Sequence, residues 1–175
     1  MKDHEKTKKL TVTALLMAMN IVLSSFSVPT PVGGMYLNDI VVVTAAVLLE
    51  PFYAFMVGGV GAFIGDMLFY PAPMLVSLAV HGLQAVLISL CVRHVLKSKP
   101  VTSSIIGAFI GWIICCGGYT LGRYYIYSTP AYAIAKIPLQ LIQTAATSFV
   151  ALLLCWPCGI KTQYDRIIGS NSYNS

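Results

Sequence analysis

Charged residues are scarce in this chain of 175 residues. Asp, Glu, Lys and Arg make up only 10% of it, against about 25% in a typical soluble domain, whereas 57% of the residues are hydrophobic. So little charge leaves no soluble domain that would bind nucleic acid, in spite of the net charge of +5. The composition therefore predicts an all-α integral membrane protein that forms a single domain.

Three kinds of chemical site are also missing from the sequence. There is no GxxxxGK[ST] phosphate-binding loop, so the chain is not expected to hydrolyse nucleotides by itself. The five cysteines lie mostly in or beside apolar segments, which favours buried free thiols over a disulfide framework. His81 and the cysteines are far apart in sequence and in expected depth, so neither a metal site nor a cofactor is expected.

Six apolar segments account for most of the chain. Five of them have or approach the roughly 20 residues that a membrane-spanning helix needs, and the second has only about 13. Such segments predict helices, because a helix satisfies its backbone hydrogen bonds internally in lipid. They cover residues 10–28, 37–49, 52–70, 74–96, 104–127 and 131–156.

The basic residues indicate how many of these segments cross the membrane. With six crossings and a cytoplasmic N-terminus, nine Lys and Arg residues lie inside, and only Arg123 and Lys136 lie in the outer half. If the short second segment did not cross, the basic residues at 93–99 would face outside, against the positive-inside rule. The sequence predicts six transmembrane helices over about residues 8–160, both termini in the cytoplasm, and a polar cytoplasmic tail over 161–175.

The first apolar segment has two different faces. Ala14 and Ala18 are four residues apart and share one side of a helix. Asn20, Ser24 and Ser27 lie on nearly the opposite side. In a membrane, small side chains let another helix approach closely, and polar side chains turn towards partners or a cavity. This pattern predicts a helix-binding face at the alanines and an internal site on the side of Asn20.

Lys136 is the polar residue that helix packing explains least well. It lies about five residues inside the last apolar segment, where an unpaired charge costs on the order of 2 kcal/mol or more. One interpretation pairs Lys136 and Arg123 with the carboxylates of Asp39 and Asp66. The other has the two cations bind an anionic group of a substrate, and both interpretations stay open at this point.

Polar side chains at helical spacings gather towards the outer ends of several segments. Each one alone is compatible with packing, and the tyrosines are compatible with an aromatic belt at the membrane interface. Three such stripes on one side favour a solute-binding cavity, where tyrosines stack on a flat ring and amides and charges orient it. The predicted substrate-binding residues are Asn38, Asp39, Asp66, Ser77, His81, Gln84, Tyr119, Arg123, Tyr127, Lys136, Gln140 and Gln143.

Cys155 and Cys158 form a CxxC pair at the end of the last apolar segment. This spacing permits a reactive thiol pair, so a small membrane thiol redox enzyme is an alternative function. Against it, the predicted topology places the pair at the reducing cytoplasmic side, and Pro157 suffices to end the helix. A permease that works alone is a further alternative.

Four sequence features occur together in one known family of small membrane proteins. They are Ala14-xxx-Ala18 in the first segment, the Pro- and Gly-containing loop at 28–36, Leu37, Asn38 and Asp39 at the start of the second segment, and Gly65-Asp66 at the end of the glycine-rich third. With six predicted spans and a polar outer cavity, the chain resembles the S components of energy-coupling factor (ECF) vitamin transporters. The resemblance covers roughly residues 8–160.

The resemblance implies a substrate-binding subunit and not an enzyme. An S component in the cell membrane of a bacterium captures a vitamin or its precursor outside and delivers it inward with a transmembrane coupling subunit and two ATP-binding cassette ATPases. The loop at 28–36 would close over the substrate, and Ala14 and Ala18 would contact the coupling subunit. The hydroxymethylpyrimidine and pyridoxine group fits best, while Arg123 and Lys136 leave an anionic substrate such as pantothenate open.

Overall fold

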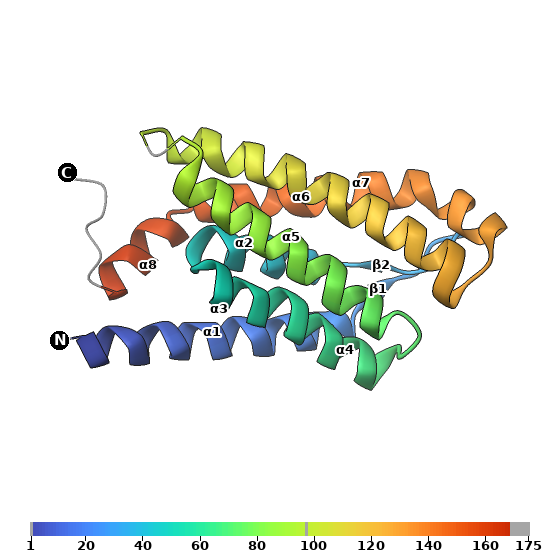
Figure 1. The fold of residues 1–175 in the computed structure, drawn as a ribbon, viewed down its shortest axis with the longest axis horizontal. Coiled ribbons are helices and arrows are strands. Elements are labelled where there is room, and N and C mark those ends of the chain that lie inside the picture. The colour runs from blue at the N-terminus through green and yellow to red at the C-terminus, as the bar shows by residue number, and fades with distance from the viewer. Residues whose placement is uncertain (1, 97, 169–175) are drawn as a thin grey trace.

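The computed structural model describes residues 2–96 and 98–168, which form a bundle of helices with one small hairpin (Figure 1). The helices run alternately between the two ends of the bundle. The elements in chain order are α1 (Lys2–Ser24), β1 (Ser27–Val28), β2 (Met35–Tyr36), α2 (Asp39–Leu48), α3 (Pro51–Phe55), the π-helical turn η1 (Met56–Val60), α4 (Gly61–Phe69), α5 (Met74–His94), α6 (Pro100–Gly122), the π-helical turn η2 (Arg123–Tyr127), α7 (Pro130–Cys155) and α8 (Ile160–Ile168).

Within the described residues, four helices are long and apolar enough to cross a membrane. The first of them is continuous through α3, η1 and α4, and the third continues from α6 into η2. They correspond to the last four of the six apolar segments and cover Pro51–Phe69, Met74–His94, Pro100–Tyr127 and Pro130–Cys155. For α1 and α2, a complete crossing stays a prediction.

The short helix α2 lies in the middle of the bundle. All of its residues except Ile40 are buried, and its ten residues rise about 15 Å, half of a bilayer core of about 30 Å. The carbonyl groups at its C-terminal end have partners on α5, because Ser89 Oγ donates to Leu49 O at 2.7 Å and Arg93 Nη2 donates to Leu48 O at 3.1 Å. At the other end of the helix, the N-terminal residue Asp39 is also buried inside the protein.

The polar side of α1 packs against η1 and α4, as its sequence predicts. Asn20 is buried, and its Nδ2 donates to Val57 O in η1 at 2.6 Å. One helical turn further, Ser24 packs so closely against Gly65 that a Cβ there would lie 2.6 Å from the Ser24 hydroxyl oxygen. Ser27, which was expected on the same helical face, lies beyond the end of α1 in strand β1 and is exposed.

Residues 27–36 form a β-hairpin, which the all-α prediction did not include. Ser27 pairs with Tyr36 and Val28 pairs with Met35 in antiparallel register. The turn contains Gly33 at φ +101°, a left-handed conformation that glycine adopts without strain. In Figure 1 this hairpin lies at the end of the bundle opposite to α8, and we call the two ends the hairpin end and the α8 end.

The polar tail expected from residue 161 onward begins instead as a packed helix. Tyr164 and Ile168 of α8 belong to the same buried cluster as α2. Lys8 Nζ of α1 donates to Ile167 O at 2.8 Å, which joins α8 to the start of the chain. Residues 169–175 of the expected tail lie outside the described residues.

Candidate functional site

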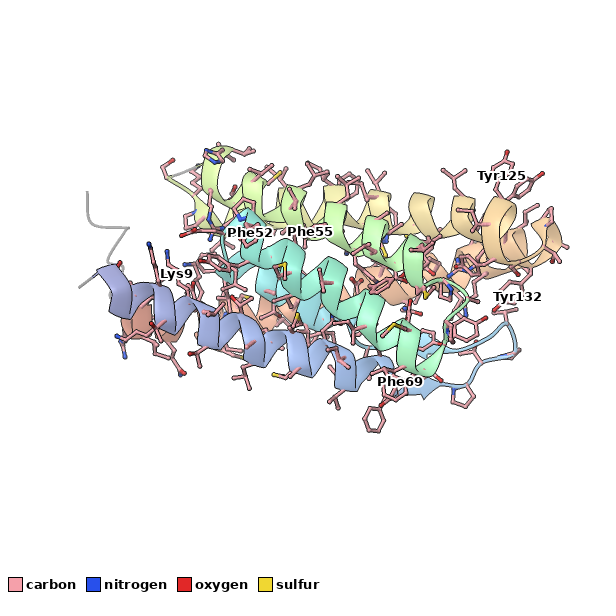
Figure 2. The ribbon with its side chains drawn as sticks, turned by 60° about the horizontal axis from the view of Figure 1, so that its bottom comes forward. Lys9, Phe52, Phe55, Phe69, Tyr125 and Tyr132 are labelled. Atoms are coloured by element: carbon pink, nitrogen blue, oxygen red, sulfur yellow. The ribbon has the colours of Figure 1, made fainter. Side chains whose placement is uncertain are left out.

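A cavity of about 260 Å³ lies at the hairpin end of the bundle. Figure 2 shows this end by Tyr125 and Tyr132, with Lys9 at the opposite end. The cavity wall combines the hairpin, the N-terminal residue of α2, the end of α4, the first half of α5, the ends of α6 and η2, and the first half of α7. The sequence placed the predicted polar stripes towards this same end.

The structure brings the twelve predicted residues together around this cavity, with two of them behind its wall. Ser77 and Gln84 are fully buried and do not line the cavity. Ser77 Oγ contacts the carboxylate of Asp66 and the hydroxyl of Tyr119 instead. The ten that line it are Asn38, Asp39, Asp66, His81, Tyr119, Arg123, Tyr127, Lys136, Gln140 and Gln143.

The floor of the cavity is a hydrogen-bonded network centred on Asp39. Gln84 Nε2 donates to Asp39 Oδ1 at 2.9 Å, and Thr147 Oγ1 donates to Asp39 Oδ2 at 3.1 Å. Asp39 also lies in the first turn of α2, where the positive end of the helix dipole stabilises a negative charge. His81 Nδ1 lies 2.8 Å from Gln84 Oε1 and carries the proton of that hydrogen bond, because the Gln84 amide nitrogen already donates to Asp39. The network thus ties α2 to α5 and α7.

The two cations of the cavity bind protein oxygens that are not carboxylates. Lys136 is 4% exposed, and its Nζ donates to Gly34 O at 2.8 Å. Arg123 is 7% exposed, and its Nη2 donates to Gln140 Oε1 at 2.6 Å. Among the described residues neither cation forms an ion pair with Asp39 or Asp66, so the structure does not show the pairing that the sequence left open.

A family model matches residues 4–158 of this chain, and its description is ECF-type riboflavin transporter, S component. The chain belongs to this family. It is also 26% identical over 131 residues to an uncharacterized protein of Pyrococcus woesei, across 74% of this chain and 86% of the relative. Its fold is similar to that of a solved S component of a bacterial ECF transporter, with a TM-score of 0.66 and 21% identity, over 87% of this chain and 96% of that chain.

Membership of the S component family confirms the resemblance that the sequence indicated. It identifies the chain as a transport protein of the membrane, in agreement with its apolar helices. The family is defined by transporter subunits that bind substrate, so the alternative of a thiol redox enzyme has no support from it. Cys155 is buried and Cys158 is exposed near the start of α8, and both thiols are free.

Sequence reasoning missed several residues that line the cavity of this S component. Tyr36 lies in the hairpin, and Tyr70 and Tyr132 lie at the ends of apolar segments, where they do not continue a polar stripe at helical spacing. The prolines and glycines around Tyr36 and Tyr70 were the available signal, since they mark shaped loops. Ser24 also lines the cavity and belongs to the polar face of α1 that was expected to meet an internal site, and the missed residues are Gly33, Gly34, Tyr36, Tyr70, Pro73, Cys115 and Tyr132.

The hydroxyl of Tyr36 supplies a neutral hydrogen-bonding group to the cavity. Burial raises the pKa of Tyr36, and the neighbouring Tyr70 and Asp66 raise this pKa further. The phenol therefore keeps its proton at neutral pH. Together with the tyrosines of α6, η2 and α7, it gives the cavity several aromatic rings and hydroxyl groups at the same time.

The expectation that His81 and the cysteines lie at different depths is wrong for Cys115. One ligand atom from each of Asp39, His81 and Cys115 lies within 4.8 Å of the others. These atoms are engaged by protein groups, however. Gln84 contacts Asp39 and His81, and the Cys115 sulfur accepts from Gln140 Nε2 at 3.8 Å and from a threonine hydroxyl of α7 at 3.7 Å. The three residues therefore form a hydrogen-bonded floor in the arrangement described.

Proposed function

We propose that this chain is the substrate-binding S component of an ATP-dependent ECF transporter and takes up a small vitamin or vitamin precursor that contains a planar ring. The observation that carries the proposal is the cavity under the hairpin, with its tyrosine rings, amides and two cations that form no ion pair among the described residues. Tyrosines stack on a flat ring, and a few directed polar groups fix its orientation. At about 260 Å³ the cavity is small for a ligand site, which fits a vitamin-sized molecule.

Two groups of candidate substrates follow from different observations. The family is named for riboflavin, so riboflavin is the first ligand to test. The second group, pyridoxine and hydroxymethylpyrimidine, comes from the resemblance to S components, and its members are single-ring molecules. Both groups present a flat ring to the tyrosines of the cavity, and they differ in size and in ring carbonyl groups.

The membrane orientation that we propose has six crossings, with both termini and α8 in the cytoplasm and the cavity facing outside. The positive-inside rule supports it, because Lys161 and Arg166 belong to α8, Arg93 binds the C-terminal end of α2, and Lys9 lies at the same end of the bundle (Figure 2). Among the described residues, the Lys and Arg side chains that line the cavity are Arg123 and Lys136. Within this orientation α2 begins at the cavity floor with Asp39 and runs to the cytoplasmic side, where it ends at Leu48. The hairpin completes the outer half.

The proposed partners are a transmembrane coupling subunit and two ATPases, which supply the energy. The face of α1 that carries Ala14 and Ala18 supports this, because both alanines are exposed while Asn20 and Ser24 are buried. Small residues on a lipid-facing surface permit a close helix crossing. Leu15 and Met19 are also exposed beside them and enlarge the apolar surface.

The hairpin is proposed as the gate through which the substrate enters. Gly33, Gly34 and Tyr36 of the hairpin line the cavity, so the hairpin forms its outer cover. Two hydrogen bonds hold the turn to α7, from Tyr132 Oη to Val32 O at 3.2 Å and from Lys136 to the turn. Breaking these bonds opens the cavity without disturbing the helices below.

The test is to identify small molecules that copurify with the protein in detergent by mass spectrometry, followed by calorimetric titration with riboflavin, pyridoxine and hydroxymethylpyrimidine. We expect one vitamin to bind with a stoichiometry of one. Liposomes that contain this chain alone should not accumulate it, whereas liposomes with the coupling subunit and ATPases should do so with ATP. Accumulation by the chain alone would contradict the proposal and favour a permease.

A further inference from the structure

Arg123 has a hydrogen-bonding group that the protein leaves without a partner inside the cavity. The residue opens η2, lines the cavity and is 93% buried, since only 7% of it is exposed. Its Nη1 is shielded from solvent and has no hydrogen-bond acceptor among the described residues. A guanidinium group has five N–H donors, and a buried donor of a charged group is costly when it is left unpaired.

The guanidinium group is nevertheless held firmly in place. On one side, Nη2 donates to Gln140 Oε1 at 2.6 Å, and the Gln140 amide nitrogen in turn donates to Thr144 Oγ1 at 3.2 Å. On the other side, the ring of Tyr119 lies below the guanidinium carbon at 5.5 Å, within the range of a cation–π interaction. The unpaired Nη1 is thus part of a side chain whose orientation is fixed by its neighbours.

The nearby acidic groups do not accept a hydrogen bond from Arg123 Nη1, because their own partners lie elsewhere. Asp39 accepts from Gln84 and Thr147, and Asp66 accepts from Ser77. In the described part of the chain, no carboxylate oxygen lies within 4.0 Å of a guanidinium nitrogen of Arg123. A ligand is therefore the natural source of an acceptor for Nη1.

We propose that Arg123 Nη1 binds a carbonyl or carboxylate oxygen of the transported molecule, and that the substrate class is vitamins that carry such an oxygen. This inference rests on the proposed function. Arginine suits the role because its planar group matches sp² oxygens and stays charged when it is buried. Gln140 and Tyr119 act as positioning residues that aim the guanidinium group.

The inference separates the candidate substrates. Riboflavin has ring carbonyl groups and so offers the oxygen that Arg123 lacks, whereas pantothenate, which has no ring and lies outside the proposed function, serves only as a carboxylate probe. Pyridoxine and hydroxymethylpyrimidine have hydroxyl groups and ring nitrogens but no carbonyl oxygen. The molecule that copurifies with the protein should therefore contain a carbonyl or carboxylate group, and a copurifying vitamin without one would overturn the inference while leaving the proposed function intact.

The direct experiment compares ligands and variants by calorimetric titration of the full chain in detergent. The probes are riboflavin, pantothenate, and the matched pair 4-pyridoxate and pyridoxine, which differ by a carboxylate in place of a hydroxymethyl group. Wild-type protein should bind at least one of the carbonyl-bearing probes more tightly than pyridoxine. Arg123→Gln should weaken binding of that probe by at least tenfold, whereas Arg166→Gln, the same change at an exposed site in α8, should leave it unchanged.

The ratio of the affinities for 4-pyridoxate and pyridoxine guards against a purely structural effect. A variant that only loses stability weakens both ligands alike, whereas loss of a specific acceptor site abolishes the preference for the carboxylate. Arg123→Lys serves as the second variant if Arg123→Gln does not fold, and it should retain part of the preference because it keeps the charge but not the geometry. An unchanged ratio and a less than threefold loss in a folded variant would overturn the inference. Failure of the wild type to bind any vitamin would instead overturn the proposed function, and the inference with it.

Discussion

Lys136 Nζ donates a hydrogen bond at 2.8 Å to the carbonyl oxygen of Gly34, a residue 102 positions earlier in the chain. This contact joins the buried side of α7 to the turn of the hairpin that covers the cavity. It gives Lys136, which lines the cavity, a structural role in holding the hairpin. It also makes the hairpin sensitive to anything that competes for the ammonium group.

We expect Lys136→Met to loosen the hairpin while the helix bundle stays folded. The ammonium group provides a charge-assisted hydrogen bond to the turn, and its loss should increase hairpin opening roughly tenfold. Hydrogen–deuterium exchange followed by mass spectrometry should show faster exchange at residues 29–34 in the absence of ligand. Lys99→Met, at an exposed lysine just before α6, is the matched control and should not change that rate. Equal exchange rates at residues 29–34 in the two variants would show that the hydrogen bond from Lys136 to Gly34 does not hold the hairpin closed.

Gly33→Ala should damage the gate through local backbone strain. The glycine has φ +101°, and a Cβ there would collide with the hydroxyl of Tyr132. We expect a local cost of about 1–2 kcal/mol and a correspondingly weaker binding of substrate in titrations. Gly117→Ala is the control, because no atom lies within 4 Å of the added methyl group and the helix favours alanine. Binding by Gly33→Ala equal to that of Gly117→Ala would show that the turn is unimportant.

Gln84→Leu should lower both thermal stability and substrate affinity, although Gln84 does not line the cavity. The side chain donates to Asp39 Oδ1 and accepts from His81 Nδ1, so its removal takes one hydrogen bond from each of these two buried groups, while Thr147 still donates to the other oxygen of Asp39. We expect the free energy of unfolding to fall by about 1–3 kcal/mol, with a lower melting temperature in detergent. Leu83→Ala, at an exposed position next to it, should change stability far less. A melting temperature equal to that of the wild type would contradict the network.

Trp at position 14 or 18 should block transport and spare binding. Ala14→Trp and Ala18→Trp place a large ring on the exposed face of α1, which prevents a close crossing with the coupling subunit. Vitamin uptake by cells with the complete transporter should fall on the order of tenfold, while titration of the purified chain stays unchanged. Met19→Trp, on the neighbouring exposed position, tests how narrow the contact is. Weaker binding by the purified variants would assign these alanines to internal packing.

The sequence was most informative where a helix has one apolar and one polar face. Helical periodicity alone was enough to separate the two sides of α1, and in the structure Asn20 and Ser24 are buried while the two alanines are exposed. The same periodicity brought Lys136 and Gln140 to the cavity wall. Periodicity could not show which partner a polar atom takes. The structure shows that the two cations bind Gly34 and Gln140 and not the carboxylates.

Contacts between distant loops were beyond the reach of periodicity. Tyr36 and Tyr70 belong to short connections whose conformation depends on the helices around them. The position of Cys115 beside His81 depends on how α5 and α6 pack, which neither helix encodes by itself. The pairing of Ser27 with Tyr36 likewise depends on a turn that Gly33 permits, and a search for apolar segments does not detect a two-residue strand.

The length of α2 has a consequence for how the substrate and the fold depend on each other. The ten residues of α2 rise about 15 Å, half of the roughly 30 Å of a bilayer core, and Asp39 at the N-terminus of the helix lines the cavity. We expect a vitamin bound in the cavity to add packing contacts to α5, α6 and α7, which contribute to its lining. The protein should therefore melt at a distinctly higher temperature when it is loaded than when it is empty. We therefore expect the bound vitamin to complete the packing between these helices.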